Sequence, residues 1–526
     1  QEKKIFMVQG PYPVIRRLLR ARGWVERKFP GTGRAGSRPE QWHGRQQEQL
    51  QEEEEDGAEQ GEASRLVHDQ VPYFIWTNHR SAVDCRLLRK DQVLNHYAGV
   101  GAFATKEGLC LNLRNLPWFD QADPNAFFPR CYWLGAAEEW KDFIEDFSLT
   151  AARSLLRTAL ERAGDMPVQM EQTLKSREEQ GESHISHPMP PTAGPGPPLP
   201  LQLVEQALQV CEQHLGSLGH QDIDGDLPSP WRTGTDWHRF LCDYYRVVHE
   251  GAGLVLSGEQ RERCQALLQH LAEHLPQLGM EGTHNVWILK PGAKSRGRGI
   301  VCTARLQEVL QVAGGCTAPS ARAGEWVVQK YVERPLLIFG TKFDIRQWFL
   351  VTDWNPLTIW FYRESYLRFC SQPFSLHHLD LARHLCNVSI QKRFRPVWGQ
   401  HPQLPLDRIW SCQQFQAYLA QVGQAGVWHQ VMVPGMKAAV VGALRSVQDL
   451  VGSRKGSFEL YGADFLFGED CQPWLLEINI SPTMAPSSAV TRRLCASVQR
   501  DTLRVVLDHR DNPTCSTGAF ELIYKE

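Results

Sequence analysis

Three oxygen-bearing side chains near the end of the chain have the types and spacing of a cation site. Asp464 lies in YGADF, and Glu477 and Asn479 lie in LLEINIS among leucine and isoleucine. Residues two apart on a strand point to the same face, and a carboxylate buried among apolar neighbours needs a compensating charge. Mg²⁺ takes oxygen ligands of this kind together with phosphates. The pattern predicts a magnesium site, with a salt-bridged strand face as the alternative.

A lysine at the end of an apolar run supplies the second candidate. In VWILKPGAKSRGRGI (286–300), Lys290 ends the run, and Gly292, Gly297 and Gly299 follow it. The spacing is not that of a Walker loop, but glycines let backbone N–H groups approach phosphate oxygens closely. We interpret the stretch as a flap over phosphates with Lys290 as its rigid contact. An exposed basic hairpin is the alternative.

A row of charges in KFDIRQW supplies the third candidate. Lys342, Asp344 and Arg346 alternate, so on a strand all three face one side. Such a row suits a nucleotide, with the carboxylate at the ribose hydroxyls or orienting the ligand and the cations at the phosphates, although a solvated ionic ladder has the same pattern. Upstream, QKYVERP (329–335) is predicted as a strand that ends at a hinge and offers backbone groups to an adenine edge. FYRESYLR and LCNVSIQK add Arg368 and Asn387.

Strands and helices in mixed order must position these residues. Strands are predicted in VWILK, EWVVQKYV, KFDIRQWFLVT, LTIWFYR, FELYGADFLF and PWLLEINI, and near the start at 5–8 and 71–77. Helical periodicity marks 14–22, 201–217, 258–275 and about 430–451. This order predicts an α/β (α+β) fold in several lobes, with helices packed on sheets.

Composition narrows the classes of protein. The 526 residues are 42% hydrophobic, which fits a folded chain of two or three lobes. The net charge of −2 gives no global basic field, so we expect no nucleic acid partner. The 14 cysteines form no Cys-x-x-Cys pair, which favours free thiols in a reducing compartment over zinc. No apolar run approaches the ~20 residues of a membrane span, and the polar start is not typical of a signal sequence. We expect a soluble, intracellular protein.

The motifs together resemble a known family. WILKPGAKSRGRGI, QKYVERP, KFDIRQW, FYRESYLR, LCNVSIQK, GADF and LLEINISP occur in the order of the tubulin tyrosine ligase-like family of ATP-grasp amino-acid ligases. The resemblance spans roughly 284–485 and extends back to NHYAGVGAFATKEGL. PYPVIRRLLRARGWVERKF and FELIYK are most similar to the monoglycylase branch. The resemblance implies a multi-lobed ATP-grasp fold with ATP bound between two β-rich lobes.

The resemblance also implies roles for single residues. The residues that bind ATP are expected to be Lys106, Lys290, Gln329, Lys330, Val332, Lys342, Asp344, Arg346, Arg368 and Asn387. Of these, Gln329, Lys330 and Val332 line the adenine hinge. Catalysis is expected from Lys290, Arg346 and Arg368, which face the phosphates and the reacting carboxylate. Asp464, Glu477 and Asn479 are expected to hold Mg²⁺. Cys386 departs from the family, in which many members have threonine.

The implied domains follow the motifs and two breaks in composition. We predict a structured segment at 1–30, an acidic and disordered insertion at 31–66, an α/β domain at 67–180, a Pro/Gly-rich linker at 181–200, a helical segment with the central ATP-grasp domain at 201–333, and a C-terminal ATP-grasp domain with the magnesium site at 334–526.

The implied activity is ATP-dependent attachment of glycine to glutamate γ-carboxylates in tubulin C-terminal tails, through an acyl phosphate. Expected partners are tubulin and microtubules, free glycine, ATP and Mg²⁺, for a monomer in the cytoplasm, on the cytoskeleton and in the cilium or axoneme. Basic residues of the first helix (Arg16, Arg17, Arg20, Arg22) or Lys392, Arg393 and Arg395 are candidates to bind the acidic tail.

Two other interpretations remain open at this point. The chain could be a polyglutamylase or another ATP-grasp carboxylate–amine ligase. From a different class, it could be a microtubule-binding protein with an inactive nucleotide site. The complete set of Asp464, Glu477 and Asn479 argues against the second interpretation.

Overall fold

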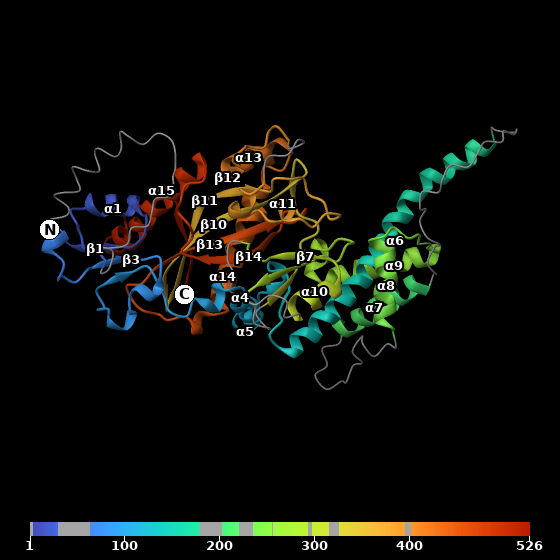
Figure 1. The fold of residues 1–526 in the computed structure, drawn as a ribbon, viewed down its shortest axis with the longest axis horizontal. Coiled ribbons are helices and arrows are strands. Elements are labelled where there is room, and N and C mark those ends of the chain that lie inside the picture. The colour runs from blue at the N-terminus through green and yellow to red at the C-terminus, as the bar shows by residue number, and fades with distance from the viewer. Residues whose placement is uncertain are drawn as a thin grey trace.

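The structure is a computed structural model that describes residues 4–29, 64–178, 202–219, 235–254, 256–292, 297–314, 326–394 and 401–526. Most of the predicted acidic insertion (31–66), the predicted linker (181–200), and Lys294, Arg296 and Arg395 lie outside the described residues. The described part is a mixed α/β fold with three β-sheets, which confirms the predicted fold class (Figure 1).

The largest sheet, here called the main sheet, has seven strands. Its path is β12 (Ile409–Ser411), β11 (Leu357–Phe369), β10 (Thr341–Trp354), β13 (Glu459–Phe467) and β14 (Pro473–Ile480), with β15 (Phe520–Lys525) on β11 and β9 (Leu337–Ile338) on β10. The predicted strands in this part of the chain are confirmed. They form because successive side chains along each strand alternate between an apolar face and a second face of the sheet.

Alternation along β10 divides the main sheet into two environments. Phe343, Ile345 and Phe349 pack into the core formed with α13 (Cys412–Gln421) and α14 (Val433–Arg445). On the opposite face, the charged row 342–346 is followed by Trp348 and Leu350, which pack against apolar residues near the start of the chain, such as Phe6, and against α15 (Ala489–Leu503). The helix predicted at about 430–451 is shorter in the structure, where it is α14. A π-helical turn at Trp428–Met432 precedes it, and a separate 3-10 turn at Gln448–Leu450 follows it.

The sheet nearest the start of the chain, the N-terminal sheet, is parallel. It has the order β2 (Val25–Glu26), β1 (Ile5–Val8), β3 (Phe74–Trp76) and β4 (Val93–Leu94), and α1 (Pro13–Arg20) covers it beside α15 (Figure 1). The short helices α3 (Gly101–Ala104), α4 (Lys106–Asn112) and α5 (Leu116–Phe119) lead from it to the third sheet.

The third sheet, here the central sheet, has the antiparallel order β5 (Cys131–Trp133), β8 (Trp326–Lys330), β6 (Trp287–Pro291) and β7 (Val301–Thr303). One face packs on α10 (Leu306–Gly314) and on a helical group at the right of Figure 1, formed by α6 (Ala137–Glu178), α7 (Gln202–Gly219), α8 (Trp237–Val248) and α9 (Gly258–His274). Helices predicted at 201–217 and 258–275 are confirmed as α7 and α9, whereas α6 and α8 were not predicted.

Buried ion pairs connect the helical group with the segments that lead into the central sheet. Glu281, which precedes β6, is 2% exposed and accepts from Arg130 at 2.6 Å and from Arg153 of α6 at 2.9 Å. Arg130 also contacts Asp146 of α6 at 2.5 Å. Burial alone raises the pKa of Glu281, but Arg153 and Arg130 outweigh it and hold that pKa well below its usual range. Among the described residues, no helix combines the length and the apolar composition that a bilayer crossing requires.

Replacing Glu281 with alanine is expected to lower the free energy of unfolding by about 3–5 kcal/mol, because two buried arginines lose their counter-charge. Urea unfolding followed by circular dichroism measures the change. Glu469→Ala is the control, because its partner Arg334 and Glu469 itself are 49% and 54% exposed, and it should cost under about 1 kcal/mol.

The direction of the pKa shift of Glu281 determines how the stability of the fold depends on pH. Since the folded state holds the pKa of Glu281 below its unfolded value, this carboxylate stabilises the fold above the unfolded pKa, and the contribution is lost as pH falls further. A similar loss of stability in both variants would contradict a structural role for the network.

Candidate active site

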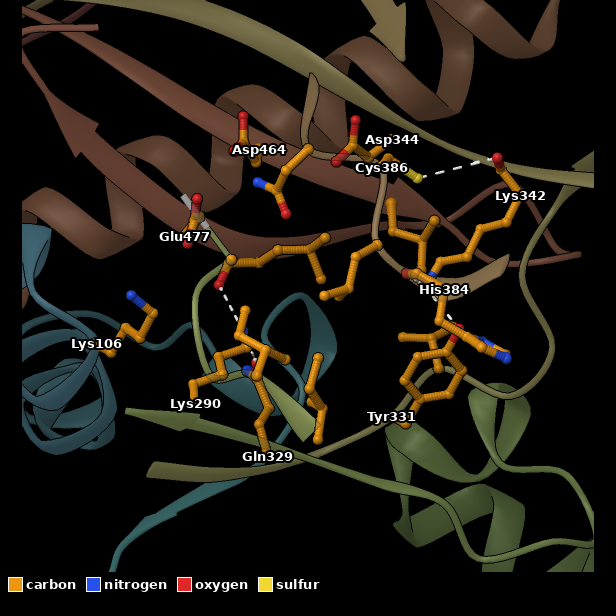
Figure 2. Close-up of a pocket in the computed structure, with 18 of the residues that line it drawn as sticks. Lys106, Lys290, Gln329, Tyr331, Lys342, Asp344, His384, Cys386, Asp464 and Glu477 are labelled. Atoms are coloured by element: carbon orange, nitrogen blue, oxygen red, sulfur yellow. Dashed lines mark hydrogen bonds between the residues drawn. The ribbon is translucent and has the colours of Figure 1, made fainter. Parts of the chain in front are cut away.

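A cavity between the central and main sheets collects most of the predicted nucleotide-binding residues (Figure 2). This cavity, called the nucleotide cavity after that prediction, is bounded by β6 and β8 on one side, by β10, β13 and β14 on the other, and by the start of α4. Of the predicted residues it is lined by Lys106, Lys290, Gln329, Lys330, Val332, Lys342, Asp344, Asn387, Asp464 and Glu477. The remaining three, Arg346, Arg368 and Asn479, contact residues of this set.

Lys290 stands at the end of β6 and is buried. Its ammonium donates to Gln329 Oε1 on the neighbouring strand at 2.6 Å and to the carbonyl of Leu476 on β14 at 3.3 Å. Burial lowers the pKa of Lys290 below its ordinary value, and Lys106 adds to this, while Glu477 opposes it. The lysine thus bridges the two sheets, as a rigid phosphate contact requires.

The acidic and basic residues of the main sheet form one buried run of alternating charge. Arg368 donates two hydrogen bonds to Asp344, at 2.6 and 2.7 Å, and lies 3.1 Å from Asp464. Arg346 donates two to Asp464, at 2.5 and 3.1 Å. Strand register places these residues opposite one another. Although burial raises the pKa of Asp464, the two arginines lower it well below its usual range, so this carboxylate is ionised.

The three predicted metal ligands converge. The Asn479 amide lies 3.2 Å from Glu477 Oε1 and 3.4 Å from Asp464 Oδ2, and register places Asp464 opposite Glu477 and Gly462 opposite Asn479. No cluster of three or more histidine, cysteine, aspartate or glutamate side chains suited to a metal occurs among the described residues. Two carboxylates and an amide fit Mg²⁺, which keeps waters and uses substrate phosphates for its other ligands.

A buried contact network around Lys342 was not predicted. Its ammonium donates to the Tyr331 hydroxyl at 2.6 Å and to the carbonyl of His384 at 2.9 Å. The Tyr331 hydroxyl also lies 2.8 Å from His384 Nδ1, and Nε2 lies 2.8 Å from the carbonyl of His378. Burial and Lys342 lower the pKa of His384 to about 4, so the imidazole is neutral: it accepts from tyrosine and donates to the carbonyl.

This network fixes the position of Lys342 in the cavity wall, which Tyr331 and His384 also line (Figure 2). The sequence offered one indication of this network, because Tyr331 lies within the motif QKYVERP. Its partner His384 could not be inferred, because it lies 53 residues further along the chain.

Two predicted residues take up positions that only the structure specifies. The Lys330 ammonium is buried against Glu333 at 2.6 Å and the carbonyl of Val286 at 2.9 Å, so it points away from the cavity, and the Lys330 main-chain N–H donates to the carbonyl of Arg130 at 2.9 Å. Asn387, the residue before α12 (Val388–Gln391) and after α11 (Leu381–His384), faces the returning end of the flap at Gly297. At Gly297 φ is +72°, a backbone conformation that favours glycine, and an added Cβ would lie 2.1 Å from the tip of the Ile390 side chain.

Comparison with known proteins places these features in a family. The sequence profile described as "Tubulin-tyrosine ligase family" matches residues 250–515. Over its full length the chain is 51% identical to tubulin monoglycylase TTLL3 of Mus musculus, of which it covers 59%, and 50% identical to tubulin monoglycylase TTLL3 of Danio rerio, of which it covers 69%. It is 45% identical to protein monoglycylase TTLL8 of Mus musculus, of which it covers 64%. The chain thus spans about three fifths to two thirds of these relatives.

Tyr331→Phe tests the unpredicted network. The change keeps the ring and removes the oxygen that accepts from Lys342, so we expect ATP affinity to fall about tenfold, the worth of one hydrogen bond to a charged group. Calorimetric titration with ATP measures it. Tyr524→Phe on β15 is the matched control, since Tyr524 lies away from the cavity. Equal affinities for the two variants would show that Tyr331 does not position Lys342.

Proposed function

The chain belongs to the tubulin-tyrosine ligase family, and from this premise we propose that it is an ATP-dependent ligase that joins glycine to glutamate γ-carboxylates of tubulin C-terminal tails. The observation that carries the proposal is the cavity between two sheets in which Lys290, Lys342 and the pair Asp464 and Glu477 face one another. Relatives named monoglycylases at 45–51% identity support glycine as the amino acid.

In this proposal the nucleotide lies in the cavity with its phosphates toward Lys106 and Lys290. Gln329, Lys330 and Val332 border the adenine through the hinge, and Asn387 closes the side beneath the flap. Asp344 acts mainly through Arg368, which it holds in place. Asp464, Glu477 and Asn479 would hold Mg²⁺, which when bound neutralises phosphate charge.

The chemistry needs cations because two anions must meet. The tail carboxylate attacks the γ-phosphorus of ATP, an acyl phosphate forms, and ADP leaves. Lys290, Arg346 and Arg368 lower the electrostatic cost of this approach, and their burial strengthens that effect. The amine then attacks the acyl carbon: a C–N bond forms, the C–O bond to phosphate breaks, and phosphate departs.

The acidic tail needs exposed cations near the cavity. On α1, Arg16 contacts Glu26 at 2.8 Å and Arg20 contacts Glu26 at 2.7 Å, and just after this helix Arg22 contacts Asp508 at 2.7 Å. These ion pairs reduce the charge that α1 offers to a tail. Lys392 and Arg393 are exposed at the end of α12, five and six residues after Asn387, and neither side chain forms an ion pair with another residue that the structure describes. We therefore place the tail along α12.

The proposed partners are tubulin and microtubules, with free glycine as co-substrate. The proposed location is the cytoplasm and cytoskeleton, including the cilium and axoneme, and the proposed state is a monomer. A polyglutamylase is the second candidate, because the nucleotide cavity serves any amine that attacks an acyl phosphate.

Incubation with ATP, tubulin and labelled glycine or glutamate tests the proposal. We expect glycine to be incorporated and Lys290→Ala to abolish incorporation, since this buried cation bridges the sheets. Arg298→Ala is the matched control: Arg298 is an exposed flap cation, so its loss should only weaken turnover. Incorporation of glutamate alone would overturn the glycine assignment, and full activity of Lys290→Ala would overturn the phosphate site.

Charge reversal tests the proposed tail path. Lys392→Glu combined with Arg393→Glu is expected to raise the KM for tubulin about tenfold and to weaken its dependence on salt, while the KM for ATP stays unchanged. Steady-state kinetics at two ionic strengths measure both effects. Arg17→Glu combined with Arg20→Glu on α1 is the control with the same change in charge. A larger effect from the α1 pair would move the tail to that helix.

A further inference from the structure

A second cavity lies directly beside the nucleotide cavity. This inner cavity has a volume of about 170 Å³, far above the ~10–15 Å³ that one water molecule needs. It shares Lys106, Lys290, Gln329, Leu476 and Glu477 with the nucleotide cavity, and it continues from them beneath α3 and α4. The two cavities therefore meet at the Lys290–Gln329 hydrogen bond and at Glu477.

We propose that the inner cavity binds the amino acid that attacks the acyl phosphate, and that its walls select glycine. The proposal rests on the proposed function and specifies where its second substrate lies. If the phosphates of ATP lie at Lys290 and Glu477, the reacting carbonyl lies there too. An amine that attacks it must approach from the side that the nucleotide does not fill, and the inner cavity opens on that side.

The mouth of the inner cavity matches the two ends of a free amino acid. Lys106 brings positive charge for the α-carboxylate. The Glu477 carboxylate, which borders both cavities, is the group that accepts from the amine. In Figure 2 the Lys106 side chain extends toward Glu477, so both ends of one small molecule can be held across this gap. The free amine attacks the acyl carbon and the C–N bond forms. Phosphate leaves with the C–O electron pair, and the proton that the nitrogen loses passes to the departing phosphate.

The floor of the inner cavity excludes a charged side chain. It is formed by Leu109, Phe128, Cys131 and Val327, all within the hydrophobic core. Burial raises the pKa of the Cys131 thiol, so this residue is uncharged as well. The side-chain carboxylate of glutamate would lose its hydration here without gaining a partner, at a cost of several kcal/mol. Glycine places nothing in this region.

Ala104, on α3, lines the inner cavity and offers a direct test. Ala104→Val adds two methyl groups to the cavity, so we expect the KM for glycine to rise about tenfold while the KM for ATP changes less than about twofold. Ala102→Val is the matched control: Ala102 lies on the same helix, is likewise partly buried against the same core, and does not line the inner cavity. Equal KM values for glycine in the two variants would overturn the proposal.

Val327→Ala enlarges the floor of the inner cavity, so this variant is expected to accept a larger amino acid than glycine. The ratio of kcat/KM for alanine to that for glycine is expected to rise about tenfold over the unmodified protein. Melting curves of all variants establish that each is folded. An unchanged ratio would show that the floor does not contact the incoming amino acid.

A binding measurement separates failure of this proposal from failure of the proposed function. Calorimetric titration of glycine and of glutamate, each with a non-hydrolysable ATP analogue present, needs no turnover. Glycine binding that Ala104→Val weakens about tenfold and Ala102→Val keeps supports the inner cavity even without ligation of tubulin. If glutamate is ligated and its binding is lost in Ala104→Val, the site holds but its selectivity for glycine is wrong. Glycine binding that neither variant changes overturns the site.

Discussion

The buried run of alternating charge on the main sheet is the constraint on which the rest of the site depends. Asp344, Arg368, Asp464 and Arg346 are each 2–7% exposed, and such charges are tolerable only in mutual contact. The contacts exist in one strand register alone, because a shift by one residue would send every side chain to the other face. The strand register that satisfies these buried charges is therefore also the register that the geometry of the site requires.

From this run the remaining parts of the site follow in order. β14 pairs with β13, so Glu477 and Asn479 arrive beside Asp464, and the carbonyl of Leu476 receives Lys290 from the central sheet. Lys290 is held there because the central sheet is anchored by Trp287, whose ring lies 5.1 Å from that of Phe143 in α6. The helical group packs on the face of the central sheet and thus helps to position this cavity wall, both through that packing and through Glu281. Both cavities open where these separately stabilised units meet.

Local patterns were predictable where a short period decides the structure. The strands around 342–346 and 473–480 follow from alternation over adjacent residues, and α7 and α9 follow from apolar positions on one side of a helix. The long helix α6 was missed because it packs against α7, α8, α9 and β5, so its apolar residues are spread around it and form no single stripe. Both ends of α14 were misplaced, because a π-helical turn before it and a 3-10 turn after it interrupt an otherwise continuous apolar pattern.

The sequence by itself determined the chemical types at the site and the faces on which they lie, because residue type and two-residue alternation are local properties. It could not determine which arginine holds which aspartate, since Arg346 and Asp464 are 118 residues apart. Only the tertiary structure shows that Lys330 pairs with Glu333 and that Tyr331 contacts His384. It also shows that three arginines on or just after α1 form ion pairs with acidic residues. Each of these outcomes depends on which distant segments pack together, and burial then makes every unpaired charge too costly to leave.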